Sequence, residues 1–342
     1  MQLSVIIPTC NKKKILEETL DVISSQVNLN EFQGLGIEFI VVNDGEDVLD
    51  ELTEKYKSIP LKIIKNLKKG AASARNTGVK YSKGEIILFH DDDILPGSHY
   101  FKRHIEVHQR HSKIILIANW VYPEHLINKG KTTSFGRYRL YFNKYISFGD
   151  QLHKTMIEQN LYEVDGMATF SCSMKRSVYE DVGPFNEMFE YAGCEDAEFS
   201  YRAMQKGYRC IYDEKNICYH NELDNFELHK WLQRQSRGIK SAVVMCKLHP
   251  EGKAHPTWYT NTPLQWADPF DVKILKIKKW LLSRKLVEKI LFGLVWFLEK
   301  IKAPDKILFR LYNALWLGNT YRSFREAYKR LFSSEQRPLP PL

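Results

Sequence analysis

The first 90 residues alternate short apolar runs with segments of helical spacing. Apolar runs typical of buried strands lie at 3–8, 38–44, 61–65 and 85–90. After Asn11, a capping residue, apolar side chains recur at helical spacing as far as Val27, and an alanine-rich helical pattern covers 71–81. Because strands separated by helices pair in parallel, this alternation predicts an α/β fold with a mostly parallel, mixed sheet flanked by helices.

The rest of the chain divides near residue 225. Before that point the patterns predict helices at 97–111 and 195–206, strands at 114–120, 208–213 and 217–220, a regular segment at 174–182, and irregular loops at 121–148 that cover a site. Beyond it, helical patterns occupy 226–247, 272–302 and 305–331, around a proline-rich stretch at 249–269. We therefore expect a sheet domain at 1–225, a helical region at 226–332 and a disordered tail at 333–342.

The formal net charge of +9 is concentrated in the C-terminal helices. Residues 272–330 carry 15 Lys and Arg against 4 Asp and Glu, which leaves 35 against 37 for the rest of the chain. The longest uncharged run there, Ile290 to Leu298, has nine residues, whereas a spanning helix needs about 20. We expect this basic amphipathic segment to lie on an anionic membrane surface. The alternative is packing against the sheet domain or against a second copy in a homo-oligomer.

The cysteines and the N-terminus predict a cytoplasmic protein. Six cysteines form neither a C-x-x-C pair nor a dense disulfide scaffold, which indicates reduced thiols. No basic segment with an apolar core precedes the first strand. Together with the basic helices, this predicts a peripheral position on the inner face of the cell membrane. Nucleic acid is not expected as a partner, because no nucleic-acid-binding module accompanies the charge.

Three adjacent acids, Asp91, Asp92 and Asp93, directly follow the apolar strand pattern EIILF. Carboxylates so close together repel one another unless a cation neutralises them. Hard divalent ions such as Mg²⁺ and Mn²⁺ take oxygen ligands and commonly bridge a carboxylate to a diphosphate. The segment therefore predicts a metal site, with an acidic surface loop as the alternative.

Other polar residues stand where predicted strands end or helices begin. Asp44 ends the strand pattern VVND and can accept from a nucleobase or a ribose, or else form a turn with Gly45. Arg75 lies in the helix after Gly70, where it can contact a phosphate or form a structural ion pair. The remaining candidates are Glu195 and Asp196, at a helix start where one of them can act as a general base, and His220, a metal-ligand candidate at a strand end.

Six motifs occur in the order seen in family-2 inverting glycosyltransferases of the GT-A fold, and the resemblance covers residues 3 to 220. The motifs are SVIIPTCNK (4–12), VVNDG (41–45), GAASARNTG (70–78), LFHDDDILP (88–96), DVGPFNE (181–187) and GCEDAEFSYR (193–202). The sequence departs from the usual pattern at Glu46, where a serine is common, and at Cys194, where a glycine or small residue is frequent. Neither change removes a chemical function.

The resemblance implies a role for each matched position. Pro8, Thr9, Asp44 and Arg75 match residues that bind the nucleobase and the ribose. Asp91 resembles the acid that faces the ribose or the sugar, with Asp92 beside it as a donor-binding residue. Asp93 resembles the metal ligand, and Asp91 and His220 are further candidate ligands. Asp196 matches the catalytic base, and Glu195 lies near the acceptor.

The implied activity is inverting transfer of a sugar from a nucleotide diphosphate sugar, UDP-linked by resemblance, to an acceptor hydroxyl, with Mn²⁺ or Mg²⁺ as cofactor. The acceptor would be a glycan or a lipid-linked sugar. A non-catalytic protein that binds sugar nucleotides or acts as a scaffold in glycan assembly is the alternative. A dinucleotide-dependent oxidoreductase is excluded, because PTCNKK follows the first strand in place of G-x-G-x-x-G.

Overall fold

The chain forms two compact units in a computed structural model, which describes residues 2–28, 34–142, 154–189, 191–222, 224–250 and 257–332. The first, here called the sheet unit, comprises Met1–Leu126, Tyr145–Glu190 and Glu195–Glu222. The second, the helical unit, comprises Ile127–Lys144, Tyr191–Cys194 and Leu223–Leu342. The helical unit thus begins near the expected boundary at 225 but also takes in two earlier segments. The expected disordered tail at 333–342 lies outside the described residues.

The sheet unit is built on one mixed ten-stranded sheet, in the order β3-β2-β1-β4-β9-β6-β10-β8-β7, with β5 paired to β10. Strands β3, β2, β1 and β4 are parallel to one another, as the alternation in the first 90 residues predicts, and β6 is parallel to β10. The remaining pairs are antiparallel. The strands are β1 (Leu3–Thr9), β2 (Ile37–Asn43), β3 (Leu61–Lys65), β4 (Ile86–His90), β5 (Ile94–Pro96), β6 (Ile114–Val121), β7 (Lys154–Glu158), β8 (Leu161–Val164), β9 (Ser171–Lys175) and β10 (Arg209–His220).

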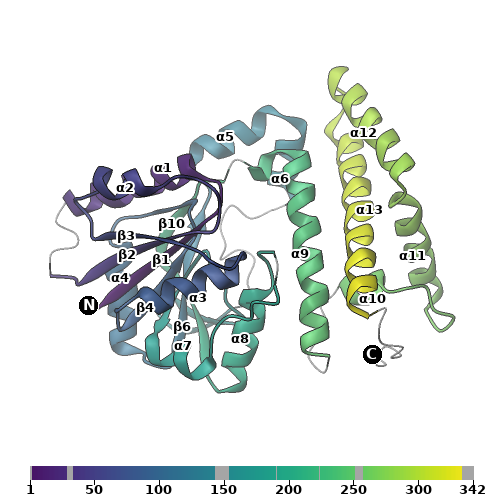
Figure 1. The fold of residues 1–342 in the computed structure, drawn as a ribbon. Helices are drawn as coiled ribbons and strands as arrows, with labels where there is room; N and C mark the ends of the chain where they lie inside the picture. The colour runs from purple at the N-terminus through teal and green to yellow at the C-terminus, as the bar shows by residue number, and fades with distance from the viewer. Residues whose placement is uncertain are drawn as a thin grey trace. The chain divides into compact units, whose positions relative to one another are not determined.

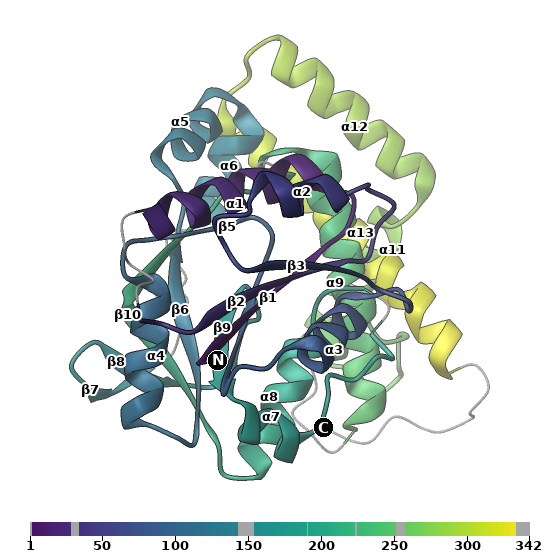
Figure 2. The same cartoon turned by 60° about the vertical axis from the view of Figure 1, so that its left-hand side comes forward.

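Helices cover both faces of this sheet. They are α1 (Lys13–Asn28), α2 (Asp50–Lys55), α3 (Ala71–Tyr81), α4 (Tyr100–Arg110), α7 (Arg176–Val182) and α8 (Glu195–Gln205). Helices α1 and α2 lie along one side of the first strands and α3 along the other (Figure 1, Figure 2). Successive residues of β4 point to opposite faces: Phe89 packs against Tyr179 and Phe185, whereas His90 packs against Tyr100 of α4. Burial lowers the pKa of His90 to about 4, so this histidine is neutral and part of the core.

Part of the predicted irregular stretch at 121–148 is helical, so that prediction was wrong. Two helices of nine residues each, α5 (Glu124–Thr132) and α6 (Ser134–Phe142), lie there. Each is too short to show a clear helical period, and the polar residues between them interrupt the pattern. The predicted strands at 208–213 and 217–220 are one strand, β10, with an irregularity in register between Asp213 and Ile217.

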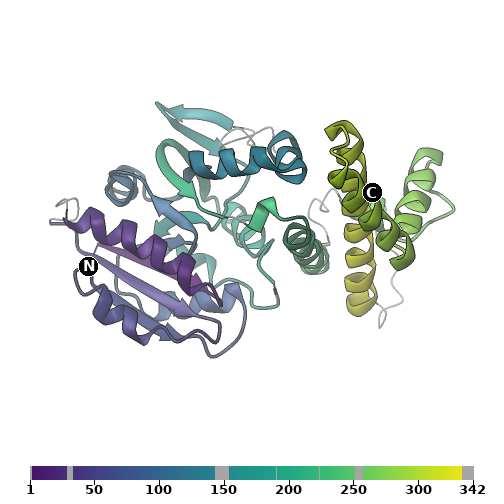
Figure 3. The same ribbon diagram turned by 90° about the horizontal axis from the view of Figure 1, so that it is seen from above.

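The helical unit packs around α13 (Asp305–Phe332). Its other long helices are α9 (Leu228–Leu248), α11 (Phe270–Leu282) and α12 (Lys285–Lys300), with the short η2 (Asp224–Phe226) and α10 (Thr257–Asn261). Within this unit α13 lies between α9 on one side and α11 and α12 on the other (Figure 1, Figure 3). The core includes aromatic residues of α6, α9 and α13, namely Phe135, Tyr138, Trp231 and Tyr312. None of the helices in the described ranges combines the length and the apolar character needed to cross a bilayer.

The single helix predicted at 272–302 is two helices. The helix is interrupted between α11 and α12, where Arg284 adopts an extended backbone with ψ 131. Ser283 donates a hydrogen bond from its hydroxyl to the carbonyl oxygen of Trp280 (2.7 Å), which gives the backbone a local alternative to the helical pattern. Gly318 of α13 packs directly against Leu282 at this break, where a Cβ would clash with backbone. The sequence alone shows no proline or glycine that marks the break.

Candidate active site

The candidate site lies where the parallel strands β1, β2 and β4 end. Hydrogen bonds anchor these ends: the amide of Asp44, after β2, donates to the carbonyl of Thr9 in β1 (2.8 Å), and the amide of Asp91, after β4, donates to the carbonyl of Phe170, just before β9 (2.9 Å). The carboxyl ends of neighbouring parallel strands form one edge of the sheet, which is where α/β folds bind ligands. This edge therefore collects the polar residues that follow each strand.

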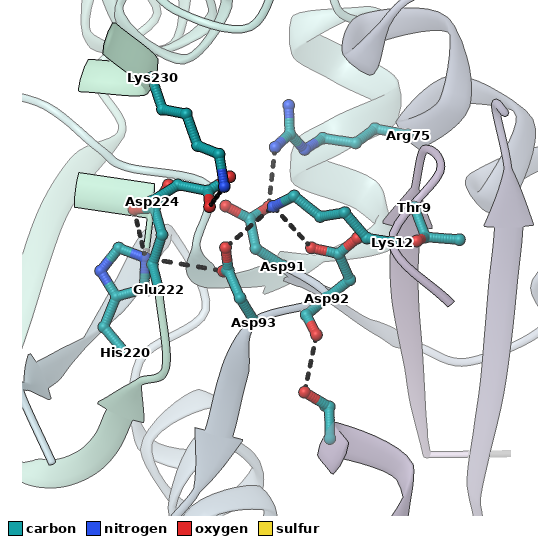
Figure 4. Close-up of polar contacts among 11 residues, drawn as sticks. Thr9, Lys12, Arg75, Asp91, Asp92, Asp93, His220, Glu222, Asp224 and Lys230 are labelled. Atoms are coloured by element: carbon teal, nitrogen blue, oxygen red, sulfur yellow. Dashed lines mark hydrogen bonds and ion pairs between the residues drawn. The ribbon is translucent and has the colours of Figure 1, made fainter. Parts of the chain in front are cut away.

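Backbone contacts hold the three-acid segment in a tight turn between β4 and β5. The hydroxyl of Thr19 donates to the carbonyl oxygen of Asp92 (2.7 Å), and the amide of Asn221 donates to that of Asp93 (2.8 Å). The amide of Ile94 closes the turn on the carbonyl of Asp91 (3.2 Å). As a result the three carboxylates point in different directions, and their partners differ, although Asp92 and Asp93 share Lys12 (Figure 4).

Asp92 points into the protein. It is 5% exposed and accepts a hydrogen bond from the hydroxyl of Thr9 (2.7 Å). Burial raises the pKa of this carboxyl to about 7, while the neighbouring Lys12 opposes the rise. The contact between Thr9 and Asp92 joins the ends of β1 and β4. The structure thus engages both of these expected donor-binding residues in contacts within the protein.

Lys12 lies between two of the acids (Figure 4). Its ammonium nitrogen is 3.3 Å from Asp92 Oδ1 and 3.1 Å from Asp93 Oδ2. Burial would lower the pKa of Lys12, but the charges of Asp93 and Asp92 outweigh it and raise the pKa above its usual value. Sequence reasoning missed this residue. The signal for it was the run of three lysines after the first strand, Lys12 to Lys14.

Asp93, His220 and Glu222 form a group that can hold a metal ion. All three side chains are buried, and one ligand atom of each lies within 4.8 Å of the others. His220 Nε2 is 3.6 Å from Asp93 Oδ1 and 3.3 Å from Glu222 Oε2. The pairing of β5 with β10 sets His220 opposite Ile94, next to Asp93. Asp93 and His220 are both expected metal ligands, whereas sequence reasoning missed Glu222, two residues after the histidine.

Arg75 connects the first of the three acids to the start of α8. The guanidinium is 3% exposed and donates from Nη1 to Glu195 Oε1 (2.7 Å) and from Nη2 to Asp91 Oδ1 (3.0 Å). Burial would lower its pKa, but the charges of Asp91 and Glu195 raise the pKa overall. Asp91, also expected as a metal ligand, therefore lies against Arg75, outside the group formed by Asp93, His220 and Glu222.

Asp196 lies beside this ion pair, in the first turn of α8. Gly193 and Cys194 just before it both have positive φ, 122 and 69, so a sharp turn leads into the helix. The carboxylate is half-buried and accepts a hydrogen bond from the amide of Ala197 (2.7 Å). Burial and the nearby charge of Glu195 raise the pKa of Asp196 to about 7. A carboxyl with this pKa is suited to accept and release a proton near neutral pH.

Asp44 holds the loop that leads into α3. Its carboxylate accepts from the side-chain amide of Asn66 (2.6 Å) and from the amide of Gly70 (3.0 Å). The turn that follows β2 uses a different residue, because Asn43 Oδ1 accepts from the amide of Gly45 (3.0 Å). Pro8, the remaining candidate, lies half-buried in β1. The structure thus positions Asp44 at the expected edge, bound to the loop before Arg75.

A sequence model of glycosyl transferase family 2 matches residues 4–183, which is more than half of the 342 residues. The chain belongs to glycosyl transferase family 2. It is therefore a glycosyltransferase, and the family expected from the six motifs is confirmed.

Two curated relatives align with most of this glycosyltransferase. Glycosyltransferase AglE of Haloferax volcanii is 25% identical over 242 residues, which are 69% of this chain and 72% of that protein. Probable glycosyltransferase YdaM of Bacillus subtilis is 25% identical over 256 residues, which are 71% of this chain and 56% of that protein. Both relatives carry glycosyltransferase names, in agreement with the family.

Solved structures confirm the predicted fold class. The mannosyltransferase PcManGT from Pyrobaculum calidifontis, solved in complex with GDP-Man and Mn²⁺, superimposes with a TM-score of 0.54 at 17% identity. The match covers 98% of this chain and 88% of that one. The glycosyltransferase therefore has the GT-A type of α/β fold, a mixed sheet flanked by helices, with a helical C-terminal region.

Proposed function

We propose that this glycosyltransferase transfers a sugar from a nucleotide diphosphate sugar to an acceptor hydroxyl and inverts the configuration of the anomeric carbon. The observation that carries the proposal is the separation of two acidic groups at one edge of the sheet. Asp93, His220 and Glu222 form one group, Glu195 and Asp196 the other, and Arg75 pairs with Asp91 and Glu195. A donor diphosphate with its metal and an acceptor hydroxyl need two such separate groups.

The metal would be held by Asp93, His220 and Glu222. Two carboxylates and one imidazole fit Mn²⁺ better than Mg²⁺, which prefers oxygen ligands alone. When bound, such an ion supplies positive charge that stabilises the diphosphate as it leaves. Lys12 shares the carboxylate of Asp93 and adds a second positive charge on the same side of the three-acid segment.

The donor nucleotide would lie along the ends of β1 and β2. Asp44 retains free acceptor positions for a nucleobase or a ribose, because a carboxylate accepts more hydrogen bonds than the two partners it has. Asp91 is fixed by Arg75 on one oxygen and offers the other to the ribose or the sugar. We propose uridine as the base, from the family resemblance; a neighbouring structure, GalNAc-T7, was solved with UDP, GalNAc and Mn²⁺.

Asp196 would act as the general base. It takes the proton of the acceptor hydroxyl, whose oxygen attacks the anomeric carbon from the face opposite the diphosphate, so the configuration inverts. The amide of Ala197 fixes one carboxylate oxygen and leaves the other available for the hydroxyl. Glu195 is held by Arg75, and its charge keeps the pKa of Asp196 near the working pH. The acceptor would be a glycan or a lipid-linked sugar.

Asp196→Asn tests the base directly. We expect this variant to lose at least about a thousand-fold in kcat, because the amide cannot accept the proton, while its affinity for the donor stays within a factor of about two. Transfer would be measured by release of the nucleoside diphosphate and donor affinity by calorimetry. Asp181→Asn, which removes an exposed carboxylate, is the matched control and should behave as wild type.

Two results would contradict this proposal. Full activity of Asp196→Asn would remove that residue from the role of base. Donor binding without turnover by the wild-type chain, across a panel of nucleotide sugars and acceptors, would instead identify a non-catalytic protein that binds sugar nucleotides or acts as a scaffold.

A further inference from the structure

Helix α11 buries lysines and exposes apolar side chains, which is the reverse of an ordinary surface helix. It buries two lysines, Lys276 at 1% and Lys279 at 6% exposure. The side chains that it exposes are apolar and recur at intervals of four and three residues, so they form one stripe: Phe270 (79%), Ile274 (52%), Ile277 (48%) and Leu281 (50%). A surface helix normally faces its apolar stripe to the core and its lysines to water.

Polar contacts fix this orientation. Lys276 forms an ion pair with Asp268 (2.8 Å) and donates to the hydroxyl of Thr262 (3.2 Å). Lys279 donates to Thr260 Oγ1 (2.8 Å) and to Asn261 Oδ1 (3.0 Å). Rotating α11 to bury its apolar stripe would break these contacts and leave Asp268 buried without its cation. These contacts therefore keep the apolar side of α11 facing outward.

Helix α12 extends the exposed apolar surface. Its inner side, including the buried Val295, packs on the core cluster around Tyr312 of α13. Its outer residues lie at intervals that again define one side of the helix: Leu286 (71%), Ile290 (53%), Leu294 (43%) and Phe297 (51%), followed by Ile301 (56%). We call the two exposed stripes, on α11 and α12, the outer apolar face. Isolated exposed apolar residues are normal on proteins, but an apolar stripe on the exposed side of each of two successive helices is a candidate binding surface.

The charges around the outer apolar face are positive. Residues 270–302 contain nine Lys and Arg and three Asp and Glu. Two of the three acids bind inward, because Glu288 pairs with Arg322 (2.6 Å) and Glu299 accepts from the hydroxyl of Tyr312 (2.5 Å). Most of the outward charge therefore comes from lysines and arginines.

Basic side chains lie over the rings of three exposed tryptophans. The three pairs are Lys273 over Trp266 (5.4 Å), Arg284 over Trp280 (4.0 Å) and Lys300 over Trp296 (5.2 Å). An indole with a basic side chain beside it combines an apolar body with a group that binds phosphate. Tryptophan is also enriched at the level of the lipid headgroups, because its ring is apolar and its N–H is polar.

A cavity of 340 Å³ adjoins the stripe on α11. Ile277 and Trp280 line it, and both are also exposed, so it is reached from the outer apolar face. Arg325 lines it as well, and its buried Nη1 has no hydrogen-bond partner among the described residues. An apolar cavity with one unsatisfied guanidinium nitrogen is suited to a phosphate and the first carbons of an attached chain.

We propose that the outer apolar face docks on an anionic lipid bilayer, with α11 and α12 lying in the plane of the headgroups. Apolar stripes would enter the boundary between headgroups and acyl chains, and the flanking lysines would bind lipid phosphates. A second copy fits less well, because a symmetric contact would bring the basic residues of α11 and α12, other than the buried Lys276 and Lys279, close to the same residues of the other copy. The proposal goes beyond sugar transfer and does not depend on it.

The test is binding of the full chain to lipid vesicles by co-sedimentation. The wild type should bind vesicles that contain phosphatidylglycerol, bind pure phosphatidylcholine much more weakly, and dissociate as the salt concentration rises. The double variant Leu286→Gln/Ile290→Gln should lose at least about ten-fold in binding, since both side chains are exposed and enter the bilayer. Met156→Gln/Met204→Gln removes two exposed apolar residues of the sheet unit and should bind as wild type.

A second measurement keeps the proposal open to refutation if a variant folds poorly. Brominated lipids should quench the tryptophan fluorescence of the wild type, and less so that of Trp296→Phe. Absence of wild-type binding to anionic vesicles would overturn the proposal. So would light scattering that shows a dimer for the wild type and a monomer for a double variant that still binds vesicles normally, because the face would then be a contact between copies. Donor turnover in solution should be unchanged, which separates this test from that of the active site.

Discussion

The sheet unit buries acids where its strands end, whereas the helical unit buries lysines beneath an apolar outer face. In both places a buried charge is paired: Arg75 with Asp91 and Glu195 in the first, Lys276 with Asp268 in the second. The composition differs. The acids gathered in the site are Asp91, Asp92, Asp93, Glu195, Asp196 and Glu222, and Lys12 and Arg75 form ion pairs with some of them.

This difference separates a binding site from a structural pair. Two of the buried carboxylates in the sheet unit, Asp93 and Glu222, lie beside His220, a metal-ligand type of residue, and such a group can bind a cation. The Lys276–Asp268 pair is neutral as a whole and needs nothing more. Its role is to fix which side of α11 faces outward.

Arg75→Met should have the largest effect on stability. It leaves the buried Glu195 without its cation, so we expect a loss of about 3–5 kcal/mol in the free energy of unfolding. Urea unfolding of the full chain measures it. Arg209→Met breaks an exposed pair with Glu163 and should cost no more than about 1 kcal/mol. Equal losses in the free energy of unfolding of the two variants would show that the ion pair of Arg75 with Glu195 is not buried.

Lys276→Met should destabilise less. Methionine fills a similar volume, but Asp268 and Thr262 lose their partner, which costs about 1–3 kcal/mol. The effect is smaller than for Arg75 because Lys276 pairs with a single acid, Asp268, whereas Arg75 pairs with two. Lys278→Met, on the exposed side of the same helix, is the control and should change unfolding little. A stabilised Lys276→Met protein would contradict the inverted arrangement.

The pH profile of the free enzyme should show the raised pKa of Asp196. A general base works only when ionised, so kcat/KM should fall as the pH drops through about 7 and be constant above it until another group titrates. At pH 6 the expected loss is about ten-fold relative to the plateau. An acid limb near pH 4, the ordinary range of a carboxyl, would show that Glu195 and burial do not shift this base.

Local patterns predicted the parts of the fold that depend on neighbours in sequence. The β-α-β alternation gave β1 to β4 and their parallel order, because a strand and its crossover helix are adjacent in the chain. The same patterns placed Asp44 and Asp91 at predicted strand ends, whereas Thr9 was chosen only through the resemblance to the family.

Contacts between distant strands could not be predicted in this way. Glu222 joins the candidate metal group only because β5 pairs with β10 and sets His220 opposite Ile94. In the sequence Lys12 is an ordinary lysine near a helix start. Its ion pairs with Asp92 and Asp93 form only because the turn after β4 lies next to it in the fold. The break between α11 and α12 depends on the packing of Gly318, 34 residues beyond Arg284 in sequence. The partners of these residues are set by tertiary contacts, which local patterns do not show.

The most direct test of the account is metal-dependent turnover of a panel of nucleotide sugars by the wild type, by Glu222→Gln and by the exposed control Glu180→Gln. We predict that a chelator abolishes release of the nucleoside diphosphate and that Mn²⁺ restores it better than Mg²⁺. Glu222→Gln should need at least about ten-fold more Mn²⁺ for half-maximal rate, and Glu180→Gln the same as wild type. Full activity in the presence of the chelator, or an unchanged Mn²⁺ requirement in Glu222→Gln, would contradict a metal site at Asp93, His220 and Glu222.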